Sequence, residues 1–257
     1  MRQSCAEFRF YEELNDFLPI EERKQTIVYR FEGAPGIKDP IESIGVPHTE
    51  VELIIVNGRS VGFDYKLRNH DRVAVYPVFE SFDVTPLVRL REQSMRKCHF
   101  VVDVNLGKLA RWLRLLGFDT LYRNDYSDAE LAAVSVAQKR ILLTRDRFLL
   151  RQKIITHAYW VRAHDPDQQI LEVLTRFDLY NQVVPFKRCL RCNGAINEVE
   201  KSEIADQLKP LTRRYYKRFY RCDACKKIYW RGPHYEEMLR KLCDLAREND
   251  HFHAPSV

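Results

Sequence analysis

The sequence lacks any long apolar run. No window approaches the roughly 18–20 uncharged apolar residues that a membrane helix needs, and charged side chains interrupt the first stretch, MRQSCAEFRFYEEL. This excludes a membrane-spanning helix and argues against a signal peptide, so the expected compartment is the cytoplasm. Internal repeats and low-complexity tracts are also missing. With 45% hydrophobic and 12% aromatic residues among 257, the chain is not disordered as a whole and can form two or three small domains.

A disulfide framework is not expected either, because the chain has seven cysteines, an odd number, and no signal peptide. Four of them form two CxxC pairs separated by 29 residues. A two-residue spacer lets both thiolates of a pair reach one tetrahedral ion at about 2.3 Å, and four sulfurs close its coordination shell, which suits a structural Zn²⁺. An iron–sulfur centre and a redox dithiol are the alternatives. The predicted zinc ligands are Cys189, Cys192, Cys222 and Cys225. The long gap between the pairs predicts a hairpin or another insertion.

The charge is spread unevenly. Residues 1–95 hold 12 Lys and Arg against 16 Asp and Glu, whereas residues 186–247 hold 16 against 8. A basic C-terminal part behind an acidic N-terminal third indicates a polyanionic partner for the C-terminal part.

Residues 1–82 have the pattern of a small β-rich domain. Asn57-Gly58 lies between two apolar runs in VELIIVNGRSVGFD, and this dipeptide is the strongest short-range hairpin signal. The spacing of Ile37, Ile41 and Ile44 predicts a helix. The expected order is strands over 6–11 and 25–31, a helix over 37–44, the hairpin over 51–64 and a last strand over 71–77.

This order resembles the ubiquitin-like β-grasp fold, and the segments VNG and DRVAVYP resemble its sulfur-carrier branch. Sulfur carriers end in a Gly-Gly tail, but here the strand continues into VFESF. We therefore expect a β-grasp domain with an accessory role, able to bind a protein partner, rather than a sulfur carrier. Residues 83–97 are interpreted as a linker.

Residues 98–185 alternate between strand and helix patterns, which predicts an α/β domain with a parallel sheet. Asn105 is placed to cap the first helix and Gly117 to end it. A third block, 186–247, contains both cysteine pairs and ends in a helix over 234–245. The expected elements of the middle block are strands over 99–104, 140–144 and 159–161, and helices over 106–116, 128–138 and 167–177.

Acidic residues mark the ends of the predicted strands. Asp103 lies near the end of the first strand, and Asp146 follows the strand RILLT. Ligands gather at the carboxyl ends of parallel strands, and Asp128, which opens the intervening helix, can point to the same edge. Three such carboxylates repel one another unless a divalent cation neutralises them. Mg²⁺ or Mn²⁺ held there can activate water and stabilise the displacement of a phosphodiester.

Each acid also has a structural alternative. Asp146 could cap the helix that follows it, and Asp128 could complement its helix dipole. Glu130 fits a capping box with Ser127. Asp165 is either a fourth metal ligand or a turn residue. Two further acids are interpreted as turn residues: Asp119 and Asp125.

Four motifs occur in one order: VDVNLGKLARWLRLLGFDT, LTRDRFLL, RCLRCNG and CDACKKIYWRGPHYEEM. Over residues 98–245 they resemble the Mut-seven C-terminal RNase domain, a PIN-like nuclease fold with a C-terminal zinc ribbon. Bacterial members of that family often carry a ubiquitin-like β-grasp domain in front. The resemblance implies that Asp103, Asp128 and Asp146 bind Mg²⁺ or Mn²⁺. Arg145 could stabilise phosphoryl charge or pair with its neighbour Asp146.

A basic and aromatic segment, RRYYKRFYR, lies between the cysteine pairs. Basic groups contact phosphates, and aromatic rings stack on unpaired bases. The alternative is a β-hairpin whose rings pack on the ribbon while its charges are solvated. Three basic residues of the helix over 106–116 could likewise steer RNA or form a solvated face. The candidate RNA-binding residues are Lys108, Arg111, Arg114, Arg213, Arg214, Tyr216, Lys217 and Arg218.

The sequence thus predicts a metal-dependent endoribonuclease with three parts: a β-grasp domain (1–82), a PIN-like RNase domain (98–185) and a zinc ribbon (186–247). The alternative is a non-catalytic RNA-binding or ribosome-associated adaptor that uses its acids structurally.

Overall fold

The computed structural model describes residues 3–77, 98–185 and 187–247, so the linker expected over 83–97 lies outside the described residues. Contacts divide the chain into two units. The first contains the N-terminal part together with residues 146–160, and the second contains residues 98–145 and the chain from residue 161 onward. The segment 146–160 thus groups with the N-terminal part, although it lies inside the middle block in the sequence.

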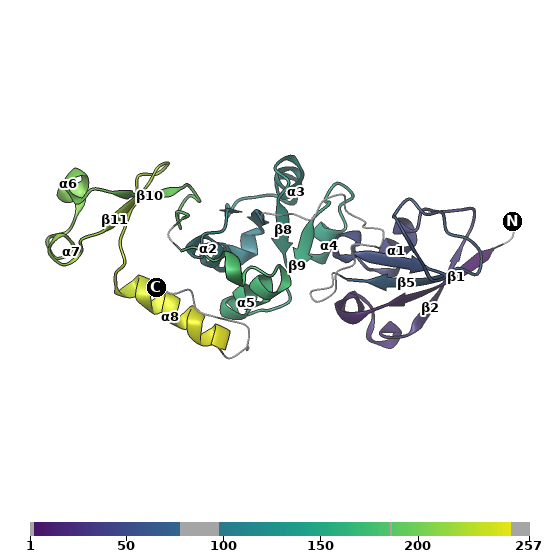
Figure 1. Ribbon diagram of the computed structural model, residues 1–257. Helices are drawn as coiled ribbons and strands as arrows, with labels where there is room; N and C mark the ends of the chain where they lie inside the picture. The colour runs from purple at the N-terminus through teal and green to yellow at the C-terminus, as the bar shows by residue number, and fades with distance from the viewer. Residues whose placement is uncertain (1–2, 78–97, 186, 248–257) are drawn as a thin grey trace. The chain divides into compact units, whose positions relative to one another are not determined.

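The first unit is built on a five-stranded sheet in the order β2-β1-β5-β3-β4, of which Figure 1 labels β1, β2 and β5. The parallel pair β1–β5 is flanked by antiparallel strands on both sides. Asn57 (φ 49°) and Gly58 (φ 83°) join β3 to β4, which is the two-residue turn expected for this dipeptide. The predicted β-grasp fold is confirmed. Its elements are β1 (Ser4–Phe10), β2 (Thr26–Phe31), α1 (Lys38–Ile44), β3 (Leu53–Val56), β4 (Arg59–Val61) and β5 (Arg72–Tyr76), with 3-10 helices at Glu12–Phe17, Ile20–Glu22 and His48–Glu50.

Residues 146–160 of the same unit form α4 (Arg147–Leu150) and β9 (Ala158–Trp160). Buried polar groups of the β-grasp domain hold this segment. The Glu50 carboxylate accepts a hydrogen bond from the Trp160 backbone N–H at 2.7 Å, and the His48 ring lies 2.9 Å from the Ile155 carbonyl oxygen. The β-grasp domain therefore fixes the stretch of chain that begins at Asp146.

The second unit contains the parallel strands β7 (Thr120–Leu121), β6 (Phe100–Val102) and β8 (Ile141–Thr144), with β6 between the other two. All three residues of β6 are fully buried, as expected for a central parallel strand. The sequence did not predict the two-residue strand β7. The helices are α2 (Gly107–Leu115), α3 (Asp128–Ala137) and α5 (Pro166–Arg176), with 3-10 helices at Val104–Leu106 and Tyr180–Gln182.

The ends of α2 were predicted in part. Gly117 follows the helix with φ 96°, and a Cβ atom there would lie 2.1 Å from the Val184 carbonyl oxygen, so glycine is required. Asn105, by contrast, does not cap α2. It lies within a 3-10 turn, and the N-cap is Leu106, which makes no side-chain cap bond.

The cysteine module, which we define as residues 187–232, contains an antiparallel sheet in the order β10-β11-β12. Its insertion between β10 and β11 is helical (Figure 1). The alternative of a β-hairpin for the basic and aromatic segment therefore holds only for the end of that segment, which lies on β11 and pairs antiparallel with β10 and β12. The helix α8 (Pro233–Arg247) follows the module. The elements are β10 (Ile196–Val199), α6 (Lys201–Ile204), a 3-10 helix at Ala205–Gln207, α7 (Pro210–Tyr215), β11 (Phe219–Cys222) and β12 (Ile228–Tyr229). In the described part of the chain, no helix combines the length and the apolar character needed to cross a bilayer.

Candidate metal centre and acidic site

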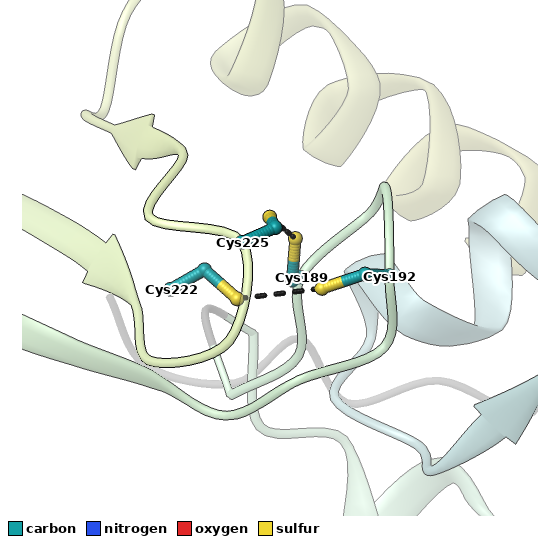
Figure 2. A group of neighbouring side chains, drawn as sticks. All are labelled: Cys189, Cys192, Cys222 and Cys225. Atoms are coloured by element: carbon teal, nitrogen blue, oxygen red, sulfur yellow. Dashed lines mark hydrogen bonds between the residues drawn. The ribbon is translucent and has the colours of Figure 1, made fainter.

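The two CxxC pairs come together, as predicted. Figure 2 shows the four side chains converging from two loops. The Sγ atoms of Cys189 and Cys225 lie 3.5 Å apart, and so do those of Cys192 and Cys222. A disulfide needs about 2.05 Å, whereas a tetrahedron of bonds of about 2.3 Å has edges of about 3.8 Å. The four sulfurs, all within 4.8 Å of one another, can therefore hold a metal such as zinc.

The surroundings of the sulfurs suit thiolate ligands. Burial alone would raise the pKa of the Cys189 thiol, but hydrogen bonds from the Tyr229 hydroxyl and from backbone N–H groups outweigh it and lower the pKa to about 6. Partial loss of solvent around its sulfur, together with hydrogen bonds to the other three cysteine sulfurs, raises the pKa of Cys192 to about 12. The Cys189 thiol thus loses its proton readily, whereas the Cys192 thiol does not. A bound cation would compensate the negative charge of the thiolates.

The backbone also approaches the sulfurs closely. A Cβ atom at Gly194 would lie 3.0 Å from the Cys222 sulfur and 3.3 Å from the Cys192 sulfur. Glycine at this position of the RCNG motif leaves the space that the ligand cluster occupies.

Asp103 lies directly after β6 and is only 4% exposed. Its backbone N–H bonds to the Leu143 carbonyl oxygen at 3.0 Å, and its Oδ2 accepts a hydrogen bond from the Thr144 hydroxyl at 2.6 Å. Both partners belong to β8. The carboxylate therefore lies at the carboxyl ends of two adjacent parallel strands, where the sequence predicted it.

Asp128 and Asp146 lie at helix starts. Asp128 is exposed and is the first residue of α3, next to Ser127 and Glu130, which form the predicted capping box. Asp146 is the N-cap of α4, and its Oδ1 accepts the Phe148 backbone N–H at 2.7 Å. The capping role that was one alternative for Asp146 is thus present.

The three acids are divided between the two units, with Asp103 and Asp128 in the second and Asp146 in the first. Among the described residues, the four cysteines are the one group of three or more potential ligands whose atoms all lie within 4.8 Å of one another. Binding of a catalytic cation by Asp103, Asp128 and Asp146 is therefore a proposal and not an observation.

Arg145 and Asp165 make local contacts. The Arg145 guanidinium donates to the Ala163 carbonyl oxygen at 3.1 Å and lies 2.9 Å from the His164 ring. Asp165 caps α5 by accepting the backbone N–H groups of Asp167 and Gln168. The capping bonds support the turn interpretation of Asp165 over a role as fourth ligand.

Arg114 corrects one prediction. It is 5% exposed, and its guanidinium donates to the carbonyl oxygens of Thr120 (2.9 Å), Leu190 and Arg191 (3.2 Å each). Arg114 is therefore buried inside the second unit, where those carbonyl groups accept its hydrogen bonds. It is no longer a candidate for contacts with RNA. The other two basic residues of α2, Lys108 and Arg111, are exposed as expected.

Asp119 was interpreted as a turn residue, but its carboxylate binds side chains from three different parts of the second unit. It pairs with Arg140 at 2.8 Å and with Arg188 at 3.4 Å, and it accepts a hydrogen bond from Asn193 at 2.7 Å. Burial alone would raise the pKa of Asp119, but the bonds from Arg140 and Asn193 lower it below the ordinary value. Because Asn193 follows Cys192, this network and Arg114 together fix the first cysteine pair to the parallel sheet. Nothing in the sequence around Asp119 indicated this network, because Asp119 is a single acid before a strand that was not predicted.

The basic and aromatic segment is mostly exposed, with its first part on α7. Arg213, Arg214 and Lys217 are exposed, but Arg218 forms a two-bond ion pair with Glu198 at 2.7 and 2.8 Å. Tyr216 is half-buried, with its ring centroid 6.2 Å from that of Trp230. Arg213, Arg214 and Lys217 are thus stronger candidates for phosphate contacts than Arg218 and Tyr216.

Comparison with known proteins gives two family matches. Residues 98–242 match the family described as Mut7-C RNAse domain, and residues 3–83 match the one described as Mut7-C ubiquitin. Searches among curated proteins and among solved structures give no match. The matched ranges coincide with the parts of the chain that carry the two resemblances seen in the sequence, which are thereby confirmed.

Proposed function

Because the chain belongs to the Mut7-C RNAse domain family, we propose that it is a metal-dependent ribonuclease that hydrolyses RNA phosphodiester bonds. The family match supports an RNA-related nuclease role. The metal dependence and the assignment of residues rest on the acidic site.

The observation that carries the proposal is the environment of Asp103. Its carboxylate is nine-tenths or more buried, and the Thr144 hydroxyl is its side-chain partner. Among the described residues, no Lys, Arg or His forms an ion pair with it. Burying a carboxylate without a compensating charge costs several kcal/mol. A hard divalent cation at the strand ends would supply that charge.

The residues take the following roles. Asp103 binds Mg²⁺ or Mn²⁺, and the Thr144 hydroxyl fixes the orientation of its carboxylate. Asp146, two residues after Thr144, and Asp128 add carboxylates, while Arg145 stabilises phosphoryl charge. Mg²⁺ usually keeps several bound waters and needs only one or two carboxylate ligands. The three carboxylates therefore need not all bind the ion directly. A bound cation at this position supplies an activated water and charge stabilisation.

The cysteine module assists RNA binding in this proposal, with zinc in a structural role. A closed shell of four sulfurs leaves no open position for substrate. The basic residues Arg213, Arg214 and Lys217 contact phosphates.

A nuclease assay tests the proposal. Single-stranded and structured RNA would be incubated with and without Mn²⁺, comparing the wild type with Asp103→Asn and Asp146→Asn. Asn at position 103 keeps an acceptor for Thr144, so the fold should survive while the rate falls at least about a hundredfold. The control is Asp125→Asn, an exposed acid that pairs with Arg123.

Two results would reject the proposed activity: full cleavage by Asp103→Asn, or no cleavage by the wild type under any cation. RNA binding without cleavage would favour the non-catalytic adaptor, and the capping bond that the Asp146 carboxylate accepts from the Phe148 backbone N–H is the observation on its side.

A further inference from the structure

The second unit contains a cavity of about 290 Å³ between α2, the cysteine module and α8. Its walls are mainly apolar and aromatic. This volume is at the lower end of the range for small-molecule sites, so it fits a ligand of about the size of one nucleotide. The apolar and aromatic wall residues include Leu115, Leu190, Ile196, Tyr229, Trp230 and Met238.

The aromatic wall is fixed from behind. The Tyr229 hydroxyl lies 3.0 Å from the Cys189 sulfur and 3.1 Å from the Leu190 backbone nitrogen. Trp230 packs against Tyr216 and Phe219, with centroids 6.2 and 6.5 Å away. Gly232 closes the same corner, since a Cβ atom there would lie 2.8 Å from the Trp230 Nε1. Rigid rings of this kind bind a planar ligand at little entropic cost.

The cavity also carries positive charge. Arg111 on α2, Arg188 before the first cysteine pair and Lys227 after the second all line it. None of the described residues that line it is acidic. Arg188 already pairs with Asp119, whereas Arg111 and Lys227 are exposed. The Lys227 ammonium lies 5.5 Å from the centroid of the Tyr229 ring, so its positive charge is beside the aromatic wall, where an anion can reach it.

From these features we infer that the cavity binds one unstacked nucleobase of single-stranded RNA, with the adjoining phosphate held by Arg111 and Lys227. Aromatic side chains stack on unpaired bases of any sequence, and the positive charge of the walls complements the phosphate. The inference deepens the proposed function: the pocket would position the strand that the acidic site cleaves. An apolar side chain or an acyl chain would also fill the cavity, but it would make no ionic contact with Arg111 or Lys227.

The first test is calorimetric titration of the full chain, with its zinc and without added Mg²⁺ or Mn²⁺. The probes are uridine and adenosine 5′-monophosphates, the two nucleosides and inorganic phosphate. We expect the nucleotides to bind more tightly than either part alone. Arg111→Glu combined with Lys227→Glu should raise Kd at least about tenfold, which is about 1.4 kcal/mol. Met238→Trp, which fills the cavity, should also weaken binding.

The matched control is Lys226→Glu, which changes an exposed basic residue beside Lys227 that does not line the cavity, and it should bind like the wild type. Zinc content and circular dichroism establish that each variant is folded. Equal nucleotide affinity in the wild type and the double variant would overturn the inference, as would preferential binding of a fatty acid.

A second test does not depend on mononucleotide affinity. A single-stranded oligonucleotide containing 4-thiouridine would be cross-linked by light and the modified peptides identified. Cross-links within residues 228–238 support the inference, and cross-links confined to other segments overturn it.

These outcomes are separable from those of the nuclease assay. Asp103→Asn should bind nucleotides like the wild type. Loss of nucleotide binding in the double variant of a protein that never cleaves RNA would reject the nuclease and keep the pocket. Unchanged kcat/KM on single-stranded RNA in the double variant would reject the pocket and keep the nuclease.

Discussion

His48 is a titratable side chain enclosed within the first unit. It is 7% exposed, its Nδ1 lies 2.5 Å from the Glu42 carboxylate, and its Nε2 lies 2.9 Å from the Ile155 carbonyl oxygen. The nearby carboxylate favours the protonated ring. Burial, and next the positive charge of Lys38, outweigh that attraction and lower the pKa of His48 below its ordinary value.

The lowered pKa predicts how stability depends on pH. The unfolded chain, in which His titrates near its ordinary pKa of about 6.5, takes up the proton more readily than the folded unit. Stability is therefore fully present above about pH 6.5 and is lost as the pH falls through the lower folded pKa. The thermal midpoint of the wild type should drop more between pH 7.5 and 5.5 than that of His48→Gln.

His70→Gln provides the control for this measurement, because His70 is exposed and its replacement should leave the pH profile of the wild type unchanged. A profile of His48→Gln that is as steep as that of the wild type would show that His48 does not contribute.

Buried polar residues mark where single-residue reasoning from the sequence fails. Arg114 and Asp119 resemble surface residues in the sequence, because several of their partners are far away along the chain. Their partners, Leu190 and Asn193, follow 76 and 74 residues later. These distant groups, with the Thr120 carbonyl for Arg114 and the Arg140 guanidinium for Asp119, compensate for the burial of the two side chains.

At the scale of elements, regular patterns predicted most of the structure. The Asn57-Gly58 turn and the Ser127 capping box are local chemistry, and both occur as expected. The insertion between β10 and β11 was predicted only in part, because the alternating charges and rings of RRYYKRFYR are typical of a strand, but only the end of the segment forms one. Lys209-Pro210 begins a helix instead, with Pro at a position where a missing N–H costs nothing.

We expect the cysteine module to depend on a bound metal, because its three strands are short and the buried cluster at the sulfurs is small: Cys189, Cys222 and Ile196. We predict one zinc ion per chain, and that Cys222→Ser or prolonged chelation removes it. Binding energy of on the order of 10 kcal/mol would be lost from the fold of this module. Elemental analysis gives the stoichiometry, and hydrogen exchange over residues 187–232 reports the unfolding.

Cys243→Ser is the matched control, since Cys243 lies on α8 outside the cluster and should keep the full zinc content. A Cys222→Ser variant that also retains one zinc per chain would contradict the four-sulfur site.

At the scale of the whole molecule, the order of the domains was predicted from the sequence, but the grouping of segments into the two units was not. A linear reading places residues 146–160 inside the middle block, whereas Glu50 and His48 bind this segment across 110 and 107 residues. The β-grasp domain thus has a visible intramolecular role. It holds the helix whose N-cap is Asp146, one of the proposed metal ligands.

The uneven charge predicts where RNA binds. Exposed basic residues of α7 and the turn after it contribute to an excess of positive charge in residues 186–247, while residues 1–95 are net acidic. Each phosphate contact on a single strand adds about 0.7 to the slope of log K against log salt. Replacing Arg213, Arg214 and Lys217 by Gln should therefore reduce the magnitude of that slope by about 2. Fluorescence anisotropy titrations of labelled RNA at salt concentrations from about 50 to about 300 mM measure it.

The same number of exposed charges can be removed from the β-grasp domain by replacing Arg30, Arg59 and Arg68 with Gln. If RNA follows the basic part of the chain, this control leaves the slope unchanged, because counterions are released only where phosphates are contacted. Equal losses of slope in both triple variants would mean that net charge alone attracts RNA, and the segment on α7 would then have no specific part in binding.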